Sequence, residues 1–207
     1  MRILAIETAT EACSIALFDS GELIAHDHRE LGRGHAEQLV PMIAGLPDKG
    51  RAGRILVSLG PGSFTGVRIG LATARALAIA WGAEVLGYPT LALVRAQAAQ
   101  VTDAVPTVCM NGGHGEWFVA DFADTPDAGQ VRSLTPEAAA ARGALEAIVG
   151  NRASEFAALL DDGTPALSIL PDARAALLLD DAWVTRDLSP IYGRGPDATP
   201  QQAVSAA

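Results

Sequence analysis

A glycine-rich segment between an apolar run and a helical pattern is the part of this sequence that most resembles a ligand-binding loop. It extends from Ser58 to Gly70 and contains Gly-Pro-Gly-Ser-Phe-Thr-Gly. Backbone amides at such a turn and the positive end of the following helix favour an anion such as a phosphate. The lysine of the G-x-x-x-x-G-K motif is missing, and glycines equally serve a tight turn. The residues of this candidate nucleotide or phosphate loop are Glu7, Thr8, Gly60, Gly62, Ser63 and Thr65.

The histidines and hydroxyl residues give no pattern typical of a metal site or a catalytic triad. His26 and His28 share one face of an expected strand and have no third ligand nearby, and His35 has Leu39, not histidine, four residues on. No hydroxyl of the glycine-rich loop is spaced from a histidine and an acid in the manner of a triad. The sequence therefore predicts neither a metal site nor nucleophilic catalysis.

The composition is that of a globular protein with an acidic surface. The chain has 207 residues, 49% of them apolar, and a formal net charge of −9, which disfavours binding of a phosphate backbone over the whole surface. Cys13 and Cys109 stand in apolar runs without a CxxC motif, as expected for buried thiols in a reducing compartment. The chain has no apolar run of membrane-spanning length. We therefore expect a cytoplasmic protein with no membrane contact.

The elements that would position the loop follow from the apolar pattern. In the first half, we expect strands at residues 3–6, 13–18, 23–28, 55–59 and 84–86, and helices at 35–46, 65–81 and 91–100. In the second half, we expect strands at 107–110, 116–122 and 147–151, and helices at 154–160 and 171–180.

The long helix after the glycine-rich loop carries a strip of small residues. Gly66, Gly70, Ala74 and Ala78 recur every four positions, and most of the remaining surface of the helix is apolar. Such a helix must be buried on several sides. Internal burial alone would account for this pattern, but we favour an interface with a partner, shared with the helix at residues 35–46.

A weak internal repeat relates the two halves of the chain. Residues 2–18 align without a gap on residues 106–122, which places Glu7 on Asn111. The match predicts two similar lobes that each open with a hairpin, although any two hairpins would align about as well. An ATP-hydrolysing site between such lobes needs carboxylates that hold magnesium, and this pair of positions offers one.

Four segments in order resemble the TsaB (YeaZ) family. They are residues 3–10, 34–41, 60–70 and 190–197, of which the third, Gly-Pro-Gly-Ser-Phe-Thr-Gly-Val-Arg-Ile-Gly, is the most specific. The resemblance implies an α/β, actin-like ATPase fold in two lobes, with a ribonuclease-H-like hairpin in each and mixed sheets flanked by helices. We expect lobes at residues 1–102 and 103–195, with a flexible tail at 196–207.

The resemblance also implies a function. Members of the family pair with the paralogue TsaD and are joined by the ATPase TsaE, and the complex transfers a threonylcarbamoyl group to the adenosine next to the anticodon of tRNA. The paralogue has a metal-binding HxxxH motif after the long helix, whereas residues 86–94 of this chain contain no histidine. We therefore expect a non-catalytic subunit without a cofactor of its own, with tRNA bound through the complex and at most a weak ATP or ADP contact at the partner interface.

The implied pairing surface is a bundle of the first two helices. The expected interface residues are His35, Leu39, Met42, Ile43, Gly66, Arg68, Ile69, Gly70, Thr73, Ala74 and Leu77. Without TsaD, the same surface should produce a homodimer. The alternatives are a metallopeptidase of the glycoprotease class and a stand-alone nucleotide-binding ATPase.

Three positions depart from the pattern of the family. Glu7 replaces a usual Asp, Gly193 replaces a usual Leu, and the turn from Asn111 to Gly115 replaces a run that usually contains two arginines. The third change removes two positive charges from a turn that would face a nucleotide or RNA.

Overall fold

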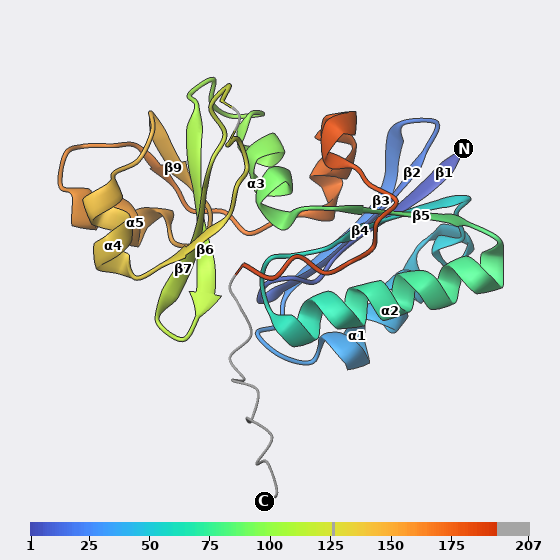
Figure 1. Cartoon of the computed structure of the whole chain (residues 1–207). Helices are drawn as coiled ribbons and strands as arrows, with labels where there is room; N and C mark the ends of the chain where they lie inside the picture. The colour runs from blue at the N-terminus through green and yellow to red at the C-terminus, as the bar shows by residue number, and fades with distance from the viewer. Residues whose placement is uncertain (126, 194–207) are drawn as a thin grey trace, which may run out of the picture.

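Two five-stranded mixed sheets form the two lobes of the chain (Figure 1). The computed structural model describes residues 1–125 and 127–193, so the expected tail at 196–207 lies outside the described residues. The first lobe contains β1 (Arg2–Glu7), β2 (Ala12–Asp19), β3 (Glu22–Glu30), α1 (His35–Gly45), η1 (Pro47–Gly50), β4 (Arg54–Ser58), α2 (Phe64–Trp81) and β5 (Glu84–Tyr88). Then follow α3 (Thr90–Ala98), β6 (Pro106–Gly113), β7 (Glu116–Asp121), β8 (Arg132–Leu134), α4 (Pro136–Arg142), β9 (Ala147–Val149), α5 (Ala153–Leu160), β10 (Ala166–Leu167), η2 (Ala173–Leu178) and η3 (Asp181–Trp183).

The central strands of the first sheet are buried on both faces, which is why they appear in the sequence as unbroken apolar runs. The strand order is β3-β2-β1-β4-β5, with β1 antiparallel to β2 and parallel to β4. Along β1, Leu4 and Ile6 pack under α1 and α2, whereas Ala5 points to the opposite face and packs with η2.

The second sheet repeats the topology of the first. Its order, β8-β7-β6-β9-β10 when written from the edge strand, again has an antiparallel hairpin followed by parallel strands. The repeat and the two-lobed ribonuclease-H-like fold are thereby confirmed. The gapless alignment is wrong by one residue in the second strand: Ala5 pairs with Ala16, but Ala120 pairs with Val108 instead of Cys109. A bulge between Asn111 and Gly113 accounts for the shift.

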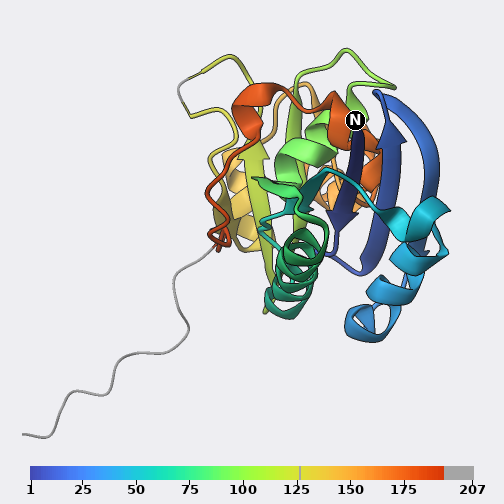
Figure 2. The same ribbon diagram turned by 90° about the vertical axis from the view of Figure 1, so that its right-hand side faces the viewer.

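Helices fill the space outside and between the sheets. In Figures 1 and 2, α1 and α2 lie together on one side of the first sheet, while α4 and α5 lie at the far side of the second. Between the lobes, η2 packs on β1 and β2, and α3 packs on β6 and β9. The segment expected as a helix at 171–180 is a 3-10 helix, and β8, α4, β10 and η3 were not expected from the sequence.

The lobe boundary expected at residue 102 stays a prediction. Residues before it pack with the second lobe, and residues far after it pack with the first. Residues of α3 belong to the apolar core beneath the second sheet. After the second lobe, the chain returns to the first: Thr185 pairs with Gly87, and the Ile191 amide donates to the Leu59 carbonyl at 2.7 Å. Among the described residues, no helix is long and apolar enough to cross a membrane.

The strip of small residues on α2 faces the sheet of the chain itself. A Cβ atom on Gly66 would overlap the Thr8 carbonyl oxygen, and a Cβ atom on Gly70 would overlap Oγ1 of the same threonine. That hydroxyl donates to the Gly66 carbonyl at 2.8 Å, and Ala74 is fully buried. The sequence correctly predicted a close approach along this strip, but the neighbour at Gly66 and Gly70 is Thr8, directly after β1, and not a partner helix.

We predict that Gly66→Ala destabilises the protein although alanine favours helices. The added methyl group would displace the backbone at Thr8, and overpacking of this kind costs about 1–3 kcal/mol. The matched control is Gly45→Ala, also in a helix, where a Cβ atom meets nothing within 4 Å and stability should not fall. Urea unfolding of both variants measures the difference, and an equally stable Gly66→Ala variant would refute the close contact.

Candidate functional site

A cleft with a volume of about 1020 Å³ lies between the lobes. Its first-lobe wall is formed by the turn after β1, the start of α2 and the returning chain at Ile191 to Gly193. The opposite wall is the turn of the β6–β7 hairpin from Asn111 to His114, together with Phe118. The cleft thus lies between the two repeated hairpins.

The residues of the candidate phosphate loop come together at the base of this wall, and the chain itself bonds two of the amides of the loop. The Ser63 amide donates to the Ala9 carbonyl at 2.6 Å, and the Gly60 amide donates to the Ser58 hydroxyl at 3.2 Å. The Ser63 hydroxyl accepts from the Gly66 amide at 3.2 Å and so caps α2, while Thr65 is exposed. This geometry favours a structural turn over a phosphate cradle.

Glu7 is a buried carboxyl group at the end of β1. Its Oε1 atom accepts from the Ala9 amide at 2.7 Å, whereas Oε2 has no hydrogen-bond partner among the described residues. The nearby hydroxyls of Ser58 and Thr90 bond to each other at 2.6 Å. Burial raises the pKa of Glu7 from 4.5 to about 7, against smaller opposing effects of the surrounding hydrogen bonds. The side chain is therefore poised to be neutral in the protein core.

The cleft does not fit a magnesium nucleotide. Glu7 is not part of its wall, and the carboxylate that does line it, Glu11, accepts from the Asn151 side chain at 2.9 Å. Arg68 is the lining residue with a permanent positive charge, so a polyphosphate would lack counter-charges. The second hairpin offers Asn111 where a second carboxylate is needed.

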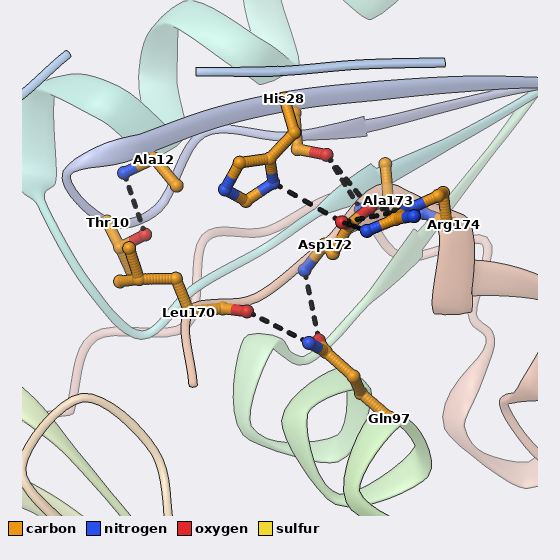
Figure 3. Close-up of polar contacts among 9 residues, drawn as sticks. Thr10, Ala12, His28, Gln97, Leu170, Asp172, Ala173 and Arg174 are labelled. Carbon is orange, nitrogen blue, oxygen red and sulfur yellow. Dashed lines mark hydrogen bonds and ion pairs between the residues drawn. The ribbon is translucent and has the colours of Figure 1, made fainter. Parts of the chain in front are cut away.

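A serine, a histidine and an aspartate also meet on the other side of the lobe junction, but not in the order of a catalytic triad (Figure 3). Asp172 lies between the other two: its carboxylate accepts from the Ser14 hydroxyl at 3.2 Å and lies 3.4 Å from His28 Nδ1. In a triad, the histidine would contact the serine. Although burial raises the pKa of Asp172, the hydrogen bonds from Arg174 and the charges of Arg174 and His28 together hold it below its usual value, so this carboxylate stays charged and anchors η2.

The expected interface residues separate into two groups in the structure. Seven are buried within the first lobe in the isolated chain: His35, Leu39, Met42, Ile43, Gly66, Gly70 and Ala74. Ile69, Thr73 and Leu77 are half-buried, and Arg68 is exposed at the mouth of the cleft. The interface itself stays a prediction, and four of the eleven expected residues are accessible on the surface of the chain.

Part of the exposed surface of the long helix is a row we call the outer α2 face, made of Ala72, Ala76 and Ile79, and the exposed Arg75 lies beside this row. All three residues of the row are exposed, and 86% of Ile79 is accessible to solvent. On the neighbouring α1, Val40 is 54% exposed. Small and apolar side chains at helical spacing leave a surface on which another helix can pack closely. In the sequence, this face could be identified as the set of positions about half a turn around the helix from the strip of small residues.

In the described part of the chain, neither the two cysteines nor the potential metal ligands form a reactive site. Cys13 and Cys109 are buried, and burial raises their pKa values to about 11 and about 12, which keeps both thiols protonated. Among the described residues, no group of three or more His, Cys, Asp or Glu side chains is arranged to hold a metal ion.

We predict that Glu7→Gln reduces the pH dependence of stability. The raised pKa means that Glu7 stabilises the fold fully below pH 4.5, and that this contribution, about 3 kcal/mol, is lost as the pH rises through about 7. Glutamine stays neutral, so its free energy of unfolding should fall less between pH 5 and pH 8 in denaturant titrations. Glu137→Gln, at an exposed position of α4, is the control and should retain the slope of the parent. Parallel curves for parent and Glu7→Gln would contradict the assignment.

Comparison with known proteins shows to which family the chain is similar. Residues 28–170 match the family model of TsaD, tRNA N6-adenosine threonylcarbamoyltransferase. The tRNA threonylcarbamoyladenosine biosynthesis protein TsaB of Escherichia coli is 42% identical over 129 residues, which cover 59% of this chain and 55% of that protein. The alignment thus spans about half of that relative. An uncharacterized protein of Mycobacterium tuberculosis is 31% identical over 96% of this chain and 94% of its own length.

A solved structure shows the same fold. YeaZ from Pseudomonas aeruginosa superposes with a TM-score of 0.68 at 26% identity, covering 86% of this chain and 89% of that one. The superposition covers most of both chains. The chain therefore belongs to the TsaB (YeaZ) family.

Proposed function

We propose that this chain is a non-catalytic accessory subunit that pairs with a TsaD-type transferase through the outer α2 face. TsaE would join the pair, and the complex would transfer a threonylcarbamoyl group to the adenosine next to the anticodon of tRNA. The exposed apolar row of Ala72, Ala76 and Ile79 carries the proposal, since it lies on the helix whose entry segment is most typical of the family. The name of the Escherichia coli relative supports the pathway.

The physical basis is the cost of leaving this row in water. Burying a side chain such as Ile79 contributes about 1.5–3 kcal/mol, and alanines beside it let the partner backbone approach. The acidic net charge of −9 makes direct capture of tRNA by this chain unfavourable, so tRNA would be bound through the complex. When the partner is absent, the same row would support a homodimer.

The arrangement of the described residues gives the alternatives no support. A metallopeptidase needs ligands that are not grouped here, and a stand-alone ATPase needs carboxylates in the cleft and free amides in the loop. We propose a cytoplasmic subunit without a cofactor of its own, and the weak ATP or ADP contact at the partner interface stays a prediction. Zinc or iron at one equivalent, or ATP turnover by the purified chain, would favour the alternatives.

We predict that Ala76→Arg weakens pairing with TsaD of the same organism at least about 30-fold, as expected when a central interface position loses about 2 kcal/mol. The bulky charge would hold the partner away from the outer α2 face without touching the core. Ala141→Arg adds the same side chain at an exposed position of α4, on the other lobe, and should pair normally. Light scattering after size exclusion, with titration calorimetry, measures both.

Normal pairing by Ala76→Arg would place the interface elsewhere. This substitution is a sharper test than one at Gly70, because a side chain at Gly70 would collide with Thr8 inside the lobe.

A further inference from the structure

Two side chains from the first turns of α2 and one from the end of the described chain form a preassembled cluster at the mouth of the cleft. Arg68 lies with its guanidinium carbon 3.5 Å from the centre of the Phe64 ring, and it donates to the Tyr192 hydroxyl at 3.2 Å. The two rings are tilted by 32° with centroids 5.8 Å apart. All three residues line the cleft.

The cluster is held in place but left open to solvent. Phe64 begins α2, and Tyr192 follows Ile191, whose amide is bonded to the first lobe at 2.7 Å. Even so, Phe64 is 54% and Tyr192 53% exposed. Aromatic rings that are both fixed and half-exposed on a concave wall are suited to stacking a planar ligand, because little conformational entropy is lost on binding.

The facing wall offers hydrogen bonds instead of charge. Asn111 is exposed, and its Oδ1 atom accepts from the Gly113 amide at 3.2 Å, while its NH₂ group makes no hydrogen bond within the described residues. His114 lies in the same turn and is exposed. An amide and an imidazole can bond the polar edge of a heteroaromatic ring while an aromatic side chain stacks on its face.

The charges of the cleft select against phosphates. The lining carries one residue of each charge, Arg68 and Glu11, and the amides of Gly60 and Ser63 are already bonded within the chain. We propose that the cleft binds an uncharged nucleobase, stacked on the ring pair of Phe64 and Tyr192 beside Arg68 and bonded at its edge by Asn111. The base can come from a free nucleoside or from an unpaired position in RNA, and recognition requires neither magnesium nor a phosphate.

The test is titration of the full chain with adenosine, AMP, magnesium-ATP and a short oligoadenylate, followed by NMR and calorimetry. We expect adenosine and AMP to bind equally well and magnesium-ATP to gain nothing. An oligoadenylate that binds more tightly than adenosine identifies RNA as the source, whereas equal affinity identifies a free nucleoside. No saturable binding of either, or a large gain with magnesium-ATP, would overturn the proposal.

The variant Phe64→Ala should weaken adenosine binding by at least about fivefold, in the range of base stacking on an aromatic side chain. Phe64→Trp keeps a stacking surface and should retain binding. Val101→Ala removes an exposed apolar side chain that does not line the cleft, and should bind as the parent does.

Pairing with TsaD distinguishes this site from the outer α2 face. Phe64→Ala should pair normally while it loses adenosine, and Ala76→Arg should bind adenosine while it loses TsaD. If Phe64→Ala abolishes pairing and leaves adenosine binding unchanged, the cluster is a protein contact and the nucleobase proposal is wrong.

Discussion

The backbone of α2 lies directly against the carbonyl groups of Thr8 and Ala9, and the rest of the first lobe is arranged around that contact. It exists because Gly62 and Gly66 have no side chains that would hold the helix away. Glu7, one residue before Thr8, is buried beside the hydroxyls of Ser58 and Thr90, and this burial raises its pKa. The close contact of the helix also fixes the rotation of α2, and so decides which residues face solvent and which reach the cleft.

Much of the first lobe could be predicted from sequence because its strands are buried on both faces and its long helix has a serine cap. The second lobe was harder for a physical reason. Strands β8 and β10 have three and two residues, too few to show alternation. Helix α4 has seven residues, four of them alanines, with little apolar periodicity, and its place is set by packing on β7 and α5.

The site was predicted less well than the fold. Periodicity shows which residues share a face of a helix, but not what that face meets, so a strip that fits a partner fits a neighbouring strand equally well. The aromatic cluster has no local pattern, since Arg68 and Tyr192 are 124 positions apart and meet only because the chain returns to the first lobe. The structure explains why glycine replaces the usual leucine at position 193. Any Cβ atom there would overlap the Phe118 ring of the second lobe.

The two hairpins have diverged in a way that changes what the cleft can recognise. A duplicated fold brings two equivalent turns to one cleft, and matched carboxylates there would hold a metal. In this chain, one turn has its carboxyl group sealed in the core, and the other has Asn111 on the surface. The cavity of about 1020 Å³ remains although its charges do not. Because half-exposed rings are unfavourable in water, Phe64 and Tyr192 at this cavity are better explained by contact with a ligand than by the stability of the free chain.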